Sequence, residues 1–144
     1  MAYKKIKSYK FTEDQLREIW SKEYCEQTII TFDDIEVKFY SNMFDHCFYE
    51  SANRQARDKS ILSLNRLEKI YWIKDTLADP TSIRKQGWDR NNKTYNNSRR
   101  VNLVKGNYIV VIRIYANKKA KFVTAYEINN DYNLKKIKDS PDWT

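Results

Sequence analysis

The stretch from Ser98 to Ile128, SRRVNLVKGNYIVVIRIYANKKAKFVTAYEI, decides the fold because it predicts three consecutive antiparallel β-strands. Its runs of Val, Ile, Tyr and Phe are typical of strands. Two short breaks, Lys105-Gly106 and Asn117-Lys118, separate these runs and carry residues that favour hairpin turns. We therefore expect a meander whose pairing register can be worked out from the sequence.

The expected register divides the meander into two faces. If each break is a two-residue loop, Val101 faces Val110 in the first hairpin and Val111 faces Thr124 in the second. Side chains alternate along a strand, so the pairing sorts them. The expected core face is apolar and comprises Val101, Leu103, Val110, Ile112, Ile114, Val123 and Ala125. The expected outer face mixes cations, hydroxyls and aromatic rings and comprises Arg100, Asn102, Val111, Arg113, Tyr115, Phe122, Thr124 and Tyr126.

The segment before the meander predicts two helices with a strand between them. Thr12 is a good N-cap for a helix over about 13–24. The sequence IEVKFY at 35–40 alternates like a strand. Apolar residues from Leu64 to Leu77 recur at helical spacing, and Asp79-Pro80 ends that helix. We place an edge strand and a loop in the polar stretch 81–97.

This order of elements predicts an α+β fold, with N-terminal helices packed on a C-terminal antiparallel meander sheet of about four strands. We expect a single domain over 1–144, with an N-terminal helical extension at 1–34, a core at 35–128 and a tail at 129–144. The sheet face opposite the helices would then be open to a ligand.

The composition favours an anionic partner. The chain has 144 residues and a formal net charge of +8, which attracts anions over a long range. Aromatic residues make up 15% of it, and exposed rings stack on unpaired bases, so we favour nucleic acid over an anionic membrane surface. With one histidine and two cysteines that lack CxxC spacing, we expect no metal site. We also expect no cofactor, since two glycines cannot build a phosphate-binding loop.

The expected compartment is the cytoplasm. The basic N-terminus MAYKKIKSYKF contains no apolar run that would indicate a signal peptide or a transmembrane span. Cys25 and Cys47 are interpreted as reduced packing residues. We therefore expect no membrane partner.

His46 is the candidate proton carrier, because histidine is the side chain whose unperturbed pKa lies near neutrality. Its flanking residues, Phe44, Cys47 and Phe48, equally suit a half-buried histidine that bonds a backbone group. On the meander, Arg113 interrupts an apolar strand and needs an anion, which is either a carboxylate of the protein or a phosphate.

The remaining candidates lie on or near the expected outer face. Arg100 or Arg99 would assist Arg113, and Thr124 and Tyr126 share its face, although both residue types are also ordinary in strands. One histidine, several arginines, a threonine and a tyrosine suit metal-independent RNA cleavage, in which the 2′-hydroxyl attacks the adjacent phosphate. Other residues expected to contact RNA are Arg99, Lys85, Trp88 and Lys121.

The order of these motifs resembles the BECR nucleases, the superfamily of barnase, EndoU, colicin-type tRNA-cleaving domains and RelE, and especially its phage-associated branch. The resemblance covers about 39–128 and is carried by FDH, NRLEKIYWIKDTLADP, RRV, NYIVVIRI and KFVTAYEI. It implies that His46 faces the sheet, and that Arg113 with Arg100 or Arg99 holds the scissile phosphate. Thr124 and Tyr126 would position that phosphate or donate a proton. FDHCFYES departs from the more regular His-containing helix of the family.

We therefore expect a metal-independent endoribonuclease of a toxin, phage or defence system that cleaves tRNA or another structured RNA. An acidic antitoxin or immunity protein is the expected protein partner. The alternative is a non-catalytic RNA-binding or inhibitory module of a mobile element that uses the same basic face. A third class is an interaction protein whose basic surface meets an acidic partner. The proton carrier is either His46 or Tyr126.

Overall fold

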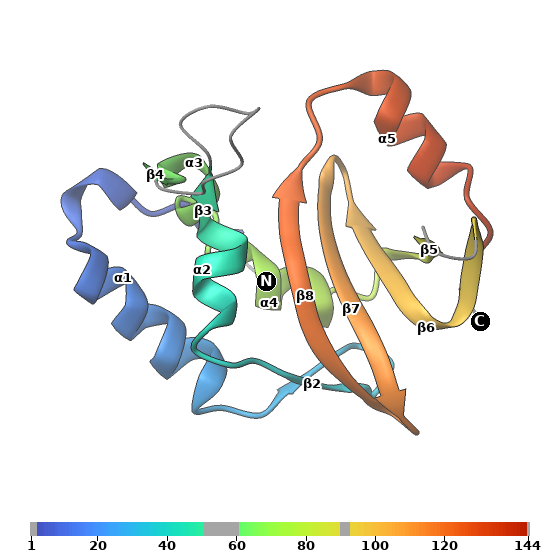
Figure 1. Cartoon of the computed structure of the whole chain (residues 1–144), viewed down its shortest axis with the longest axis horizontal. Helices are drawn as coiled ribbons and strands as arrows, with labels where there is room; N and C mark the ends of the chain where they lie inside the picture. Colours follow the sequence, from blue (N-terminus) through green and yellow to red (C-terminus); the bar gives the residue numbers. More distant parts are fainter. Residues whose placement is uncertain (1–2, 51–60, 90–92, 144) are drawn as a thin grey trace.

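The computed structural model describes residues 3–50, 61–89 and 93–143. Within these residues the fold is α+β, with N-terminal helices against a six-stranded, mostly antiparallel sheet (Figure 1). The helices are η1 (Ser8–Lys10), α1 (Glu13–Trp20), η2 (Ser21–Cys25), α2 (Met43–Phe48), α3 (Leu64–Leu67), α4 (Trp72–Ala78) and α5 (Asp131–Lys138). The strands are β1 (Ile29–Ile30), β2 (Glu36–Lys38), β3 (Tyr49–Glu50), β4 (Ile61–Leu62), β5 (Ile83–Asp89), β6 (Thr94–Lys105), β7 (Tyr108–Ala116) and β8 (Lys119–Glu127).

Helix α1 begins as the sequence predicts. The Thr12 hydroxyl accepts a hydrogen bond from the Gln15 backbone N–H at 3.2 Å, and the Gln15 side chain accepts one from the Thr12 N–H at 2.8 Å, which completes a capping box. The regular α-helix ends at Trp20, and η2 continues it as a wider π-helical turn. This turn brings Tyr24 inward, where its hydroxyl donates to the Ile70 carbonyl at 2.5 Å.

The centre of the core is an aromatic cluster around Trp20, which is 1% exposed. Its ring centroid lies 4.8 to 5.6 Å from the rings of four neighbours, which are Tyr24, Phe39, Phe48 and Phe122. These residues come from the N-terminal helices, the end of β2 and the meander. Helices α1, α2, α3 and α4 all contribute buried residues to the hydrophobic core around this cluster and cover one side of the sheet, whereas α5 lies on the other (Figure 1).

The expected helix after Ser60 is present as two shorter helices. Ser63 caps α3 by accepting from the Arg66 N–H at 3.3 Å. The chain then tightens, since the Ile70 N–H bonds the Leu67 carbonyl three residues back at 3.1 Å, while the Ile70 carbonyl accepts from Tyr24. Helix α4 follows and ends before Asp79, as predicted.

The sheet has the strand order β1-β2-β8-β7-β6-β5. The meander of β6, β7 and β8 is confirmed, and the expected edge strand in 81–97 is β5. The prediction of about four strands is too low, because β2 pairs with β8, in parallel, and β1 pairs with β2. The expected strand at 35–40 thus extends the sheet beyond β8.

The first hairpin turns one residue later than expected. Lys105 faces Tyr108, so that the loop is Gly106-Asn107, and Val101 faces Ile112 rather than Val110. Gly106 has a φ of +60°, a left-handed conformation that glycine adopts without strain. The predicted register is wrong by two residues, and because the shift is even, the side chains of β6 keep their expected faces.

The second hairpin confirms the expected loop, with Asn117-Lys118 at the turn and Val111 opposite Thr124. Between these points, however, irregularities at Tyr115 and Val123 shift the pairing by one residue. Phe122 therefore faces Ile112 on the core side, where it is 2% exposed and stacks on Phe39 at 4.9 Å. The predicted faces of Phe122 and Val123 are wrong, because a bulge exchanges them.

The segment after the meander packs against the outer face of the sheet. Leu134 and Ile137 of α5 cover an apolar patch formed by Val104, Ile109, Val111 and Val123. The chain then returns to β5, where the Gln86 N–H donates to the Pro141 carbonyl at 2.9 Å. Part of the face that we expected to be open is thus covered.

Asp79 ties the N-terminus to the sheet. Its carboxylate accepts from the Tyr3 hydroxyl at 2.7 Å and from the Thr81 hydroxyl and N–H at 2.7 and 2.9 Å, and it lies 3.3 Å from the Lys105 ammonium. These hydrogen bonds, that of Tyr3 first, hold the pKa of Asp79 well below the ordinary range of a carboxyl group.

The bulge in β8 can be tested by truncating adjacent residues. We expect Phe122→Ala to lower the free energy of unfolding by ~3–5 kcal/mol, because it empties a buried aromatic site. Val123→Ala should cost about 1 kcal/mol, because Val123 is only half-buried against α5. Urea unfolding of both variants measures this. The reverse order would mean that the strand alternates without a bulge.

The ionised form of Asp79 should stabilise the fold above the pKa of an unfolded aspartate, about 3.9, and this contribution should disappear as the pH falls. We expect Asp79→Asn to lose less stability than the wild type between about pH 5 and pH 2. Tyr3→Phe, which deletes one hydrogen bond, should give an intermediate profile. Denaturant unfolding across this range checks the order, and parallel profiles for all three proteins would contradict it.

Candidate functional site

Three cations form a row across the outer face of the meander. Arg100 of β6 faces Arg113 of β7, and Arg113 in turn faces Lys121 of β8. Neighbouring strands lie about 4.8 Å apart, so the row extends over roughly 10 Å. Like charges in directly opposite positions destabilise a sheet. The row therefore has an electrostatic cost in the free protein that a bound anion would relieve.

The carboxylate at the end of β8 is paired with a cation outside the row. Within the described residues, neither arginine of the row makes an ion pair with an acidic side chain. Glu127, at the end of β8, lies 3.7 Å from the buried ammonium of Lys69. Of the two kinds of anion that Arg113 could need, the part of the chain that the structure describes thus supplies no carboxylate partner.

Gly87 makes room for Arg100. The ladder between β5 and β6 is interrupted after Gln86, since Gln86 faces Val101 and Gly87 faces Asn96. A Cβ atom at Gly87 would lie 2.8 Å from the Cβ and 2.6 Å from the Cδ of Arg100. The Arg100 side chain therefore crosses the strand at the one position where no side chain blocks it.

Two tyrosines flank the Lys121 end of the row. The Lys121 ammonium lies 5.7 Å from the ring centroid of Tyr40 and 5.4 Å from that of Tyr115. Both rings are exposed, at 44% and 47%. Exposed aromatic rings beside a cation suit stacking on bases next to a phosphate.

Thr124 and Tyr126 lie on the same face, half-buried, along β8. Burial raises the pKa of Tyr126 above its ordinary value, and the positive charges of Arg100 and Arg66 oppose this rise. Arg100 is therefore close enough for its charge to influence the ionisation of the Tyr126 phenol. At neutral pH the phenol is protonated and can donate its proton.

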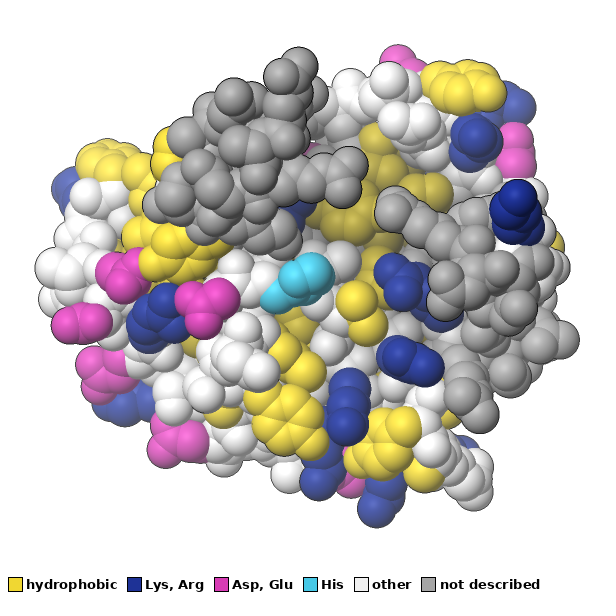
Figure 2. Space-filling view, in the orientation of Figure 1, with side chains coloured by type: hydrophobic (Ala, Val, Ile, Leu, Met, Phe, Trp, Pro, Cys, Tyr) yellow, Lys and Arg dark blue, Asp and Glu magenta, His cyan; other side chains and the backbone are white. Residues whose placement is uncertain are grey.

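His46 lies on α2, a helix of six residues. The next residue, Cys47, contacts the Ala125 carbonyl of β8 with its sulfur at 3.7 Å. The His46 side chain is exposed, and Figure 2 shows it on the same face of the molecule as Lys and Arg side chains that gather over β6, β7 and β8, with other side chains between them. The helix thus carries His46 to the edge of the face that holds the row.

Arg66 of α3 belongs to this site and was missed by sequence reasoning. Its guanidinium donates to the Cys47 carbonyl at 2.9 Å and lies 6.0 Å from the ring centroid of Tyr126. It thus joins the helix of His46 to β8. The available signal was weak: no acidic residue stands three or four positions from Arg66 to pair with it on the helix.

The other residues predicted to contact RNA do not all lie at the row. Lys121 belongs to the row, whereas Lys85 is only 13% exposed and pairs with Asp142 of the C-terminal segment at 2.6 Å. Trp88 lies in β5 and Arg99 in β6, but their side chains fall outside the described residues. Arg100 is described, and it lies on the outer face.

The described residues contain no group of three or more His, Cys, Asp and Glu side chains placed to hold a metal ion. In the same residues, no helix has the length and the apolar character needed to cross a membrane. Comparisons of the chain with protein-family models, curated proteins and solved structures give no match.

The electrostatic cost of the row predicts an unusual response to mutation. Arg113→Gln should keep or raise the free energy of unfolding, by up to about 1 kcal/mol, because it removes repulsion on both sides. Arg17→Gln should lower it, because Arg17 pairs with Asp45 and Glu13. Urea unfolding at low salt, where repulsion is least screened, compares them. A destabilised Arg113→Gln would show that Arg113 is a structural residue.

Proposed function

We propose that the protein is a metal-independent endoribonuclease that cleaves RNA on the outer face of the meander. The observation that carries this proposal is the row of Arg100, Arg113 and Lys121, which lacks acidic partners in the described residues and shares one face of the molecule with a histidine and a protonated tyrosine. Positive charge held in place before the reaction stabilises the extra negative charge that a phosphate acquires during cleavage.

The side chains divide the reaction among them. His46 takes the proton of the 2′-hydroxyl, whose oxygen forms a bond to the adjacent phosphorus while the bond to the 5′-oxygen breaks. Tyr126, protonated at neutral pH, supplies the proton to the leaving 5′-oxygen, and Thr124 positions the phosphate. The products are a 2′,3′-cyclic phosphate and a 5′-hydroxyl. Burial of the phenol favours Tyr126 as the acid rather than the base, because burial disfavours the tyrosinate that a base would need.

RNA is the substrate that this set of groups suits. The nucleophile is the 2′-hydroxyl of the substrate itself, so no metal-activated water is required, and DNA lacks that hydroxyl. The likeness of the motifs to BECR nucleases of phage and toxin systems supports the same reaction and suggests tRNA or another structured RNA as the target. An acidic inhibitor protein would cover the row.

A non-catalytic RNA-binding module is the second candidate, and the exposed rings of Tyr40 and Tyr115 favour it as much as they favour the nuclease. Such a module would bind RNA through the same row. Its affinity would fall steeply with salt, because phosphate contacts release counterions.

We expect the purified protein to cleave structured RNA in EDTA and to leave 2′,3′-cyclic phosphate ends. His46→Ala and Arg113→Ala should each lower the single-turnover rate by ~10²-fold or more, because acid–base catalysis and phosphate stabilisation typically contribute that much. Mass spectrometry of the product ends and gel assays of the rate measure this.

Lys22→Ala is the matched control, since it removes an exposed cation of η2 that pairs with Glu18. Its rate should equal that of the wild type. A requirement for a divalent ion, or equal activity in His46→Ala, Arg113→Ala and Thr124→Ala, would overturn the mechanism. Salt-sensitive binding without cleavage would instead establish the binding module.

A further inference from the structure

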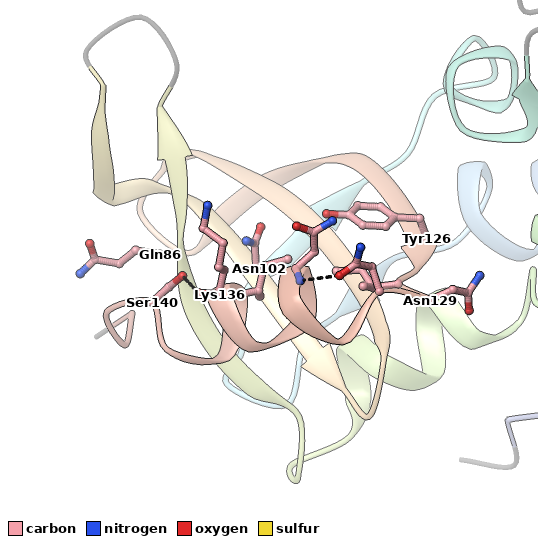
Figure 3. A pocket seen from close by; sticks show the side chains of 10 residues that line it. Gln86, Asn102, Tyr126, Asn129, Lys136 and Ser140 are labelled. Carbon is pink, nitrogen blue, oxygen red and sulfur yellow. Dashed lines mark hydrogen bonds between the residues drawn. The ribbon is translucent and has the colours of Figure 1, made fainter. Parts of the chain in front are cut away.

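A cavity of about 630 Å³ lies between α5 and the outer face of the sheet (Figure 3). Its walls come from β5, β6, the end of β8 and the C-terminal helix. Pockets of this size enclose small ligands. The residues that line it are Gln86, Asn102, Tyr126, Ile128, Asn129, Asn130, Asn133, Lys136, Ile137 and Ser140.

The polar lining is dominated by side-chain amides. An amide carries both donors and an acceptor, and asparagine or glutamine can pair with the edge of a nucleobase through two hydrogen bonds. Two of the amides serve the fold, since Asn130 caps α5 and Gln86 donates to the Asp142 carbonyl at 3.1 Å. Within the described residues, the side-chain amides of Asn102, Asn129 and Asn133 make no hydrogen bond, so these side chains are available to a ligand.

The apolar lining suits a flat ring. Ile128 and Ile137 lie on the walls together with the ring of Tyr126, and aromatic side chains stack on bases. Lys136 is the one cation among the lining residues, and no acidic residue is among them. The cavity therefore matches a neutral, planar and hydrogen-bonding group better than it matches an anion.

Tyr126 connects this cavity to the row of cations. It lines the cavity, and the positive charge of Arg100 lowers its pKa, against the rise that burial causes. Asn102 stands two residues after Arg100 on the same face of β6, which places the two Cα atoms about 7 Å apart. A phosphate on the row would thus have its own or a neighbouring base within reach of the cavity.

We propose that the cavity between α5 and the sheet binds one unpaired nucleobase of the RNA, and that its amides select which base is accepted. The inference rests on the proposed function for the identity of the ligand as RNA. Phosphate and base are then recognised by separate groups, the phosphate by the row and the base by Asn102 and Asn133.

The test is titration of the full chain with inorganic phosphate and with the four ribonucleoside 3′-monophosphates, followed by the NMR signals of the asparagine side-chain amides. One nucleotide should bind on the order of tenfold more tightly than phosphate, as a paired base edge allows, and should shift the signals of Asn102 and Asn133. Asn102→Ala and Asn133→Ala should abolish that preference. Arg113→Ala should weaken phosphate and all nucleotides alike.

Gln27→Ala, which removes an exposed amide outside the cavity, should change nothing. Equal affinity for phosphate and all four nucleotides, or an unchanged preference in both asparagine variants, would overturn the inference. The wild-type titration decides the first point even if a variant fails to fold. Cleavage without base preference would refute the base site alone, whereas selective nucleotide binding without cleavage would refute the nuclease and support the site.

Discussion

The stack of Phe39 on Phe122, with Trp20 against both rings, is the contact on which the rest of the structure depends. It joins α1 and the end of β2 to the centre of β8. Phe122 reaches the stack only because β8 carries a bulge, and the same bulge turns Lys121 to the outer face, where Thr124 also lies. The packing of the core and the placement of the candidate site thus depend on the same bulge. A regular β8 would remove Phe122 from the core and Lys121 from the row.

The row of cations, in contrast to the aromatic stack, does not stabilise the fold. Three positive side chains on neighbouring strands repel one another, and nothing in the packing of the core requires them. A fold tolerates such a local cost when the surrounding structure determines the geometry, and costs of this kind gather at functional sites. Here the buried face of the same strands stabilises the fold, and a bound anion would reduce the repulsion within the row.

The sequence predicted the meander, the capped first helix and the end of α4, because each has a local signal in hydrophobic period, capping or proline. The bulge had no such signal, so strict alternation sent Phe122 to the wrong face. The same bulge brings Lys121 into line with Arg113. Arg66 was missed because its partners, Cys47 and Tyr126, are distant in sequence. Local patterns find residues, but tertiary packing decides which of them meet.

The C-terminal segment changes what the outer face can do. The sequence predicts a tail at 129–144, and in the structure this segment contains α5, which covers the apolar part of the outer face and leaves the row exposed beside it. An uncovered sheet could bind an anion but would have little means of distinguishing one base from another. By adding amides of its own opposite Asn102, the segment forms a second wall and closes a cavity next to Tyr126. In the proposed function, recognition of the base would therefore involve residues after 128.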